Sequence, residues 1–252
     1  MNTVRNYIRS SKHMDGRKLT QYRPITVEYG ITGSAEGSAR VKIGNTEVIA
    51  GVKLSIEKPY PDTGDQGNIA VNTELLAMSS PEFEPGPPDI QSIELARVVD
   101  RGIRESHSLD THKLCILKGE KVWSVFIDIC TINDEGNLFD AASLAAIAAL
   151  KNATFPGQNE EGKVDYEKKT DKKLPISKTP IEVTVCKIGD NLFIDPLPEE
   201  EKEIEARLTV AITEKGKLCA LQKGGSAQLT IEEIDAMVAI ALEKAPELRK
   251  HL

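Results

Sequence analysis

The chain has 252 residues and 40% hydrophobic content, enough to bury a sizeable core in one large domain or two fused halves. Aromatic residues make up only 4%, so aliphatic side chains must supply most of the core. No apolar run approaches the roughly 20 residues of a membrane span, so we expect no membrane partner. The net charge of −7 excludes nucleic-acid binding over the whole surface, so any such contact must be a local patch or rely on the positive charge of other subunits.

The residues that usually carry cofactor or metal chemistry are sparse. The four cysteines, at positions 115, 130, 186 and 219, are far apart and form no CxxC pair, which predicts buried free thiols. The first 23 residues contain no apolar stretch typical of a secretory signal, so we expect a cytoplasmic protein. The four histidines are scattered, and neither a phosphate-binding GxxxxGK loop nor a Ser-His-Asp arrangement is present. We therefore expect no cofactor and no metal site built on histidines.

Apolar alternation and turn residues predict many short strands in the first part of the chain. The close spacing of the first strands favours an antiparallel sheet. A proline-rich stop at 85–88 places Asp89 near the cap of the second helix. The predicted elements are, in order, a helix over 2–11, strands over 25–29, 39–43, 48–56 and 68–76, a helix over 90–106, a hairpin over 114–117 and 122–132, and an alanine-rich helix over 140–150.

The remainder of the chain repeats this order. Residues 156–180 are rich in charge, glycine and proline, which predicts an exposed charged loop. Strands are predicted over 181–187, 191–195, 205–213 and 217–222. The capping box Thr230-Ile-Glu-Glu233 then opens a last helix that extends to about residue 243. Sheets followed by helices predict an α+β fold, with a core domain at 1–155, the loop at 156–180 and a second half at 181–252.

Three arginines share one face of the helix predicted over 90–106. At 100° per residue, Arg97, Arg101 and Arg104 fall within about 60° of one another, and Leu95, Val99 and Ile103 lie opposite. Guanidinium groups match phosphate oxygens, so a rigid helix that carries three of them suits an RNA backbone.

Local ion pairs are the alternative interpretation of these arginines. Glu94 lies three residues before Arg97, Asp100 four before Arg104, and Glu105 four after Arg101. A solvated helix face with these pairs explains the charges without any ligand. Arg17, Lys58 and Arg207 are further candidate RNA contacts.

An ordered set of segments resembles the RNase PH family. Asp15-Gly16-Arg17 and Tyr22-Arg23-Pro24-Ile25 are similar to its opening, Gly37 to Thr46 to the start of a long strand, Ile93 to Arg104 to its central helix, and Val122 to Asp134 with the alanine-rich helix to the next unit. Within the family the likeness is strongest to the non-catalytic RNase PH-like subunits of the archaeal exosome. The resemblance implies two βαβα-type halves (ribosomal protein S5 domain 2-like), with helices packed on mixed or antiparallel sheets.

The resemblance also implies partners and a function. In the archaeal exosome, such a subunit alternates with a catalytic RNase PH-like subunit in a hetero-hexameric ring, three copies of each. S1-domain cap proteins sit on one face, and RNA threads the pore, where phosphate cleaves it from the 3′ end. The implied role is to shape the partner's active site and to contribute RNA-binding arginines, because RNA-contacting arginines of this subunit type lie on the helix that holds Arg97 and Arg101.

Two positions depart from the pattern of active relatives. The arginine that holds phosphate there aligns with Phe139, which we interpret as a core aromatic, and the adjacent Asp140 would repel the anion. The carboxylate pair aligns with Glu201 and Arg207, and an arginine cannot bind a cation. The run from Glu199 to Glu205 reads as a solvated strand edge or turn.

Three functions remain open from the sequence. The first is the non-catalytic ring subunit. The second is an active phosphate-dependent 3′-to-5′ exoribonuclease that forms a homohexamer, which requires both departures to be alignment errors. The third is a small-molecule enzyme or scaffold on the same frame, since fold does not fix function.

Overall fold

The computed structural model describes residues 2–159 and 164–252. The elements are α1 (Asn2–Arg9), β1 (Ile25–Tyr29), β2 (Gly37–Ile43), β3 (Thr46–Glu57), β4 (Asn68–Glu74), α2 (Ile90–Glu105), the 3-10 helix η1 (Thr111–Leu114), β5 (Cys115–Leu117), β6 (Lys121–Asn133), α3 (Leu138–Asn152), β7 (Thr154–Gln158), β8 (Val164–Lys173), β9 (Ile181–Ile188), β10 (Asn191–Ile194), α4 (Pro198–Glu201), β11 (Ala206–Ile212), β12 (Leu218–Gly224) and α5 (Ile231–Arg249). They confirm the predicted α+β class and the repeated order of sheet and helix.

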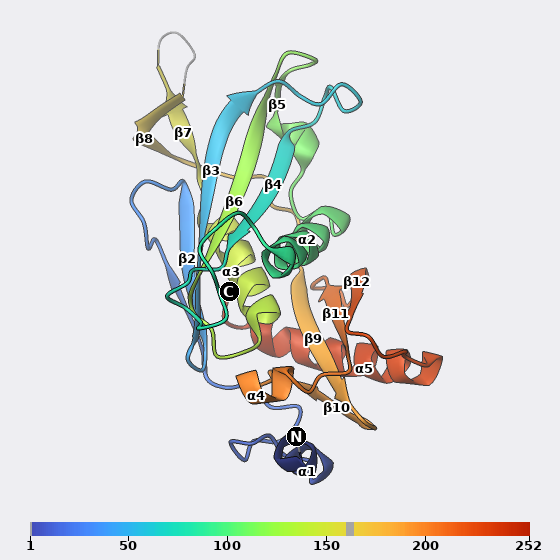
Figure 1. The fold of residues 1–252 in the computed structure, drawn as a ribbon. Coiled ribbons are helices and arrows are strands. Elements are labelled where there is room, and N and C mark those ends of the chain that lie inside the picture. The colour runs from blue at the N-terminus through green and yellow to red at the C-terminus, as the bar shows by residue number, and fades with distance from the viewer. Residues whose placement is uncertain (1, 160–163) are drawn as a thin grey trace.

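Two main sheets enclose a layer of helices. The first has the strand order β1-β2-β3-β6-β4, with β5 also on β6, and only the β4–β6 pair is parallel. The second is antiparallel, with the order β10-β9-β11-β12. Figure 1 shows α2 and α3 between these sheets, and α5 against the second sheet.

The alanine-rich helix α3 lies at the centre of this arrangement. It packs against β2, β3 and β9, so it touches both sheets. Its residues from Ala141 to Leu150 are all buried, because small side chains let two sheets approach one helix. β9 is covered on both faces, with Val183 and Val185 buried toward one side and Thr184 toward the other. One continuous apolar core therefore joins the two halves of the chain.

The predicted loop at 156–180 is wrong in its secondary structure. Most of it belongs to an antiparallel hairpin of β7 and β8 that projects from the body. β8 has charged, exposed residues on both faces, so it lacks the apolar alternation that identifies a half-buried strand. Residues 160–163 of the predicted loop lie outside the described residues.

Three smaller points complete the comparison with the sequence. None of the helices among the described residues combines the length and apolarity needed to cross a membrane. All four cysteines are free thiols, but only Cys186 is buried, so the predicted burial is wrong for the other three. The capping box at Thr230 is confirmed, and α5 continues beyond its predicted end through Pro246 to Arg249.

Candidate nucleic-acid interface

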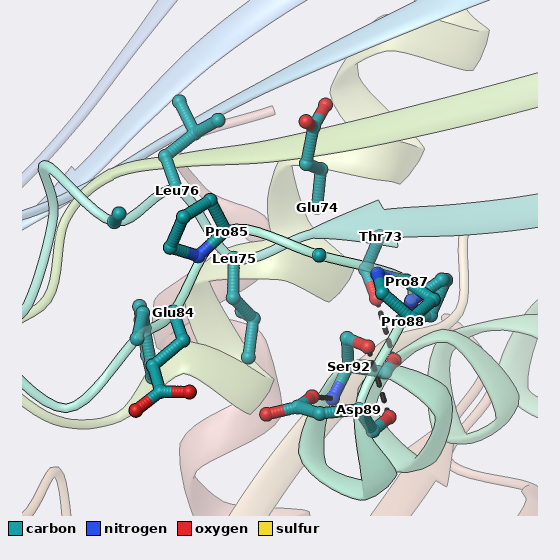
Figure 2. Close-up of a pocket in the computed structure, with 13 residues that line it drawn as sticks. Thr73, Glu74, Leu75, Leu76, Glu84, Pro85, Pro87, Pro88, Asp89 and Ser92 are labelled. Carbon is teal, nitrogen blue, oxygen red and sulfur yellow. Dashed lines mark hydrogen bonds between the residues drawn. The ribbon is translucent and has the colours of Figure 1, made fainter.

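The start of α2 is fixed to the adjacent strand. The Asp89 carboxylate accepts a hydrogen bond of 2.7 Å from the backbone N–H of Ser92, which confirms the predicted cap. The Thr73 hydroxyl of β4 donates to the Ser92 carbonyl at 2.5 Å. Figure 2 shows these bonds beside the proline loop at 85–88, in the wall of a cleft of about 180 Å³. The first turn of the helix is thereby held in place.

The inner face of α2 packs closely on the core. Leu95, Val99 and Ile103 are buried, as the helical spacing predicted. Gly102 lies against Glu182 of β9, so closely that a Cβ there would be 2.0 Å from the Glu182 Oε1. Burial raises the pKa of Glu182 to about 8, and the charge of Asp140 adds to this rise. Burial beneath the helix therefore favours the neutral form of this carboxyl group.

The three predicted arginines project from the outer face of α2, and all are exposed. Arg104 forms the predicted pair with Asp100, at 2.7 Å from Nη2 to Oδ1, and also donates to the Ile69 carbonyl. Arg101 donates from Nη1 to the amide oxygen of Gln222 on β12, at 2.9 Å. Arg101 is thus oriented by a neutral group and keeps its net charge.

Arg97 differs from both, because its predicted partner is bound elsewhere. The Glu94 carboxylate lies 2.7 Å from Nη2 of Arg207 on β11. Within the part of the chain that the structure describes, Arg97 has no hydrogen bond or ion pair. Of the three local pairs suggested by spacing, only the one with Arg104 forms. The outer face of α2 therefore presents an uncompensated positive charge at Arg97.

Phe139 and Arg207, the two predicted departures from active relatives, lie in direct contact. The Arg207 guanidinium carbon lies 4.2 Å from the centre of the Phe139 ring, in a cation–π arrangement. Both line a cleft of about 320 Å³ beside α2, with Glu94, Asn137 and Glu201 among the other lining residues. Phe139 is half-buried and packs against the main core, so the prediction of a core aromatic is confirmed in part, and the ring also borders the cleft.

Carboxylate side chains of the protein itself lie in this cleft. Glu201 Oε1 accepts a 2.8 Å hydrogen bond from the backbone N–H of Asn137, at the start of α3. Helix N-termini favour an anion, and Glu201 supplies one. Burial raises the pKa of Glu201 to about 7, against the lowering effect of the Asn137 bond. Asp140 turns away from the cleft, fully buried and bonded to Tyr22 and Thr184.

The acidic run from Glu199 to Glu205 is not simply solvated, so that interpretation is wrong. Glu200 is fully buried and lies 2.8 Å from Nδ1 of the equally buried His13. Glu203 and Glu205 bind Arg5. Within residues 2–159 and 164–252, no group of three His, Cys, Asp or Glu is arranged to hold a metal ion.

The further candidate contacts are mostly engaged within the chain. Arg17 binds Asp15 and the buried Asp195, and Arg207 binds Glu94. Gln222 was missed by the sequence reasoning, because its partner Arg101 lies far away in the chain and no local pattern signals it.

Known proteins match this chain over nearly its whole length. The model of the 3′ exoribonuclease family matches residues 21–156 with its domain 1 and 178–244 with its domain 2. The chain is 46% identical over 251 residues to the exosome complex component Rrp42 of Methanothermobacter thermautotrophicus, covering 99% of this chain and 93% of the relative. It is 46% identical over 250 residues to the same component from Pyrococcus furiosus, covering 98% and 90%.

Solved structures agree with the sequence relatives. A chain of the Archaeoglobus fulgidus exosome with RNA bound to the active site matches with a TM-score of 0.92 and 42% identity, covering 99% of this chain and 96% of that one. Rice Rrp46 matches with a TM-score of 0.69 at 18% identity, covering 94% and 95%, and shows the fold alone. The chain has the RNase PH-like fold and belongs to the 3′ exoribonuclease family.

Proposed function

We propose that this chain is a non-catalytic ring subunit of an archaeal-type exosome that positions RNA for the active site of a catalytic partner. The observation that carries the proposal is the charge on α2. Arg97 has no carboxylate partner in the described chain, and Arg101 is held only by a neutral amide. Two guanidiniums without a carboxylate partner on one anchored helix suit consecutive phosphates of a single strand. Arg104 contributes less, because Asp100 already neutralises its charge.

The lack of catalysis is supported by the contents of the neighbouring cleft. A phenyl ring stands where active relatives hold phosphate with an arginine, and Arg207 stands where a carboxylate would assist a metal. Glu201 already accepts the hydrogen bond at the start of α3, so a phosphate would meet a carboxylate there. An anion and a divalent cation are therefore both disfavoured in this cleft.

The relatives support an exosome assembly, and the sequence resemblance suggests which subunits it contains. Curated relatives are named as exosome components, and one matching structure is an archaeal exosome core. We assign this chain to a ring of three copies with three copies of the catalytic RNase PH-like subunit, beneath S1-domain cap proteins, in the cytoplasm. Ile90, 86% exposed, and Ile93, 48% exposed, lie at the start of α2, where bare apolar side chains suit contact with a protein.

The test of non-catalysis uses the purified chain alone. Incubation with single-stranded RNA, inorganic phosphate and Mg²⁺ is expected to release no nucleoside diphosphate. Release that depends on phosphate would contradict the proposal and favour the homohexameric exoribonuclease instead. The catalytic relative, assayed under the same conditions, is the positive control.

A further inference from the structure

Glu94 is the residue on which the free charge of Arg97 depends. The two side chains are three residues apart on α2, a separation at which helix side chains are neighbours. A pair between them would neutralise Arg97 and place a carboxylate beside an RNA phosphate. The structure instead joins Glu94 to Arg207, with 2.7 Å between Oε1 and Nη2.

Arg97 and Arg207 are alternative partners of Glu94, and the packing of Arg207 favours the pair that Glu94 forms with it. Its guanidinium stacks on the Phe139 ring at 4.2 Å. It also lies over Gly224, where a Cβ would be 1.5 Å from Nη1, so only glycine leaves room for it. The Arg207 side chain is 14% exposed, whereas Arg97 is on the open face of the helix. A guanidinium already fixed by packing loses less entropy on pairing than a free one.

We infer that Arg207, on its Phe139 platform, is a positioning residue that sequesters Glu94 and so keeps the Arg97 guanidinium available for RNA. This inference rests on the proposed function, because it concerns how the same RNA-binding helix is kept active. It gives the two departures from the catalytic pattern a shared role. Phe139 and Arg207 support the charge of α2 from a cleft that does not itself bind phosphate.

The test measures binding of a labelled single-stranded oligoadenylate to the ring reconstituted from this chain and its catalytic relative. Arg207→Met keeps much of the side-chain length but releases Glu94, and we expect affinity to fall about three- to tenfold. Glu94→Gln alone is expected to bind at least as tightly as the parent chain. The double variant Arg207→Met/Glu94→Gln should return to within about twofold of the parent, because no carboxylate then competes for Arg97.

The rescue separates positioning from direct contact. If Arg207 touched RNA itself, Glu94→Gln would not restore binding, and that outcome overturns the inference, as does an Arg207→Met variant with unchanged affinity. The dependence of log affinity on log salt is a second readout. We expect the slope to fall by about 0.7, the value for one phosphate contact on a single strand, and to recover in the double variant.

Gly224→Ala provides a second route should Arg207→Met fail to fold. It displaces the guanidinium while both charges remain, so it should also weaken binding and also be rescued by Glu94→Gln. Arg97→Ala is measured in parallel. If Arg97→Ala does not weaken binding, the proposed RNA contact itself fails. If it does, but neither Arg207→Met nor Gly224→Ala does so, only the positioning role is overturned.

Discussion

The guanidinium carbon of Arg207 lies 4.2 Å from the ring centre of Phe139, so the two residues predicted to stand in place of the phosphate and metal ligands of active relatives are packed on each other. Without Arg207, the Phe139 ring at the start of α3 would be more exposed. Without Phe139, the Arg207 guanidinium would lose the ring on which it stacks. Together they form one stable contact that also binds Glu94. Through Glu94, this contact links the start of α3 and the strand β11 to α2.

The two open arginines of α2 are expected to carry RNA affinity. Replacing both Arg97 and Arg101 with Ala should weaken RNA binding by the reconstituted ring roughly tenfold per arginine, about 1.4 kcal/mol each, since charge-assisted bonds to phosphate are lost. Filter binding at fixed salt measures this. Arg40→Ala, an arginine on β2 already bound to Glu28 and Glu47, is the matched control. Equal affinity for the double variant and the control would refute the RNA contact.

The effect of replacing Gly102 on the stability of the protein should depend on Glu182. Gly102→Ala places a methyl group against the buried carboxyl, so we expect a loss of about 1 kcal/mol of stability despite the better helix propensity of Ala. In a Glu182→Ala background the clash is absent, and the same change should stabilise the protein. Urea denaturation of the parent chain, the two single variants and the double variant measures the coupling. A destabilising effect of equal size in both backgrounds would show that this contact does not set the position of α2.

Glu182 should also make stability depend on pH. Its folded pKa of about 8 lies above the value of 4.5 for a free glutamate, so the folded state retains a proton that the unfolded state has lost. Stability from this group is full below about pH 4.5 and falls by up to about 1.4 kcal/mol per pH unit until about pH 8. Asp140 and Glu201, with pKa values of about 7, act in the same direction at lower pH.

Glu182→Gln removes this titration and should gain stability relative to the parent chain as pH rises from 6 to 8. Urea denaturation at each pH measures the difference. The exposed Glu199→Gln is the control and should follow the parent profile. Parallel profiles for the parent and Glu182→Gln would mean that Glu182 is already ionised in the folded protein.

Asp195 joins distant parts of the chain. Its fully buried carboxylate accepts bonds from Arg17, Arg23 and Asn137. Asp195→Ala leaves the buried guanidinium of Arg23 without its anion, so we expect a loss of about 3–5 kcal/mol in the free energy of unfolding. Asp190→Ala, on the exposed turn between β9 and β10, should change stability by less than about 0.5 kcal/mol. A similar small effect at both positions would show that the network is not needed for folding.

Helices and strands were predictable from the sequence where buried residues recur at the regular spacing of a helix or a strand. The strand β3 and the helix α2 were predicted close to their observed bounds, because each has one face in the core. The hairpin strand β8 was not, because neither of its faces is buried. Sequence thus indicated most of the elements that contribute to the core, but it missed β8 and also the short elements η1, β7 and α4.

The candidate site was predictable only in part. Helical spacing placed Arg97, Arg101 and Arg104 on one exposed face, and it correctly paired Arg104 with Asp100. It could not identify Arg207 as the partner of Glu94, because that contact depends on how β11 docks beside α2. The choice among competing partners is tertiary, so the charge that remains on the helix was not readable from the sequence.

The most direct test of the central claim is RNA phosphorolysis by the complex of this chain with its catalytic relative. The two are co-purified, their mass is measured, and nucleoside diphosphate release from single-stranded RNA is compared for each chain alone and for the mixture. We predict a mass that corresponds to three copies of each, no release by this chain alone, and release by the mixture that slows when Arg97 and Arg101 are both Ala while the mass is unchanged. Phosphate-dependent release by this chain alone would contradict the account. So would a release rate of the mixture that does not change when Arg97 and Arg101 are replaced with Ala.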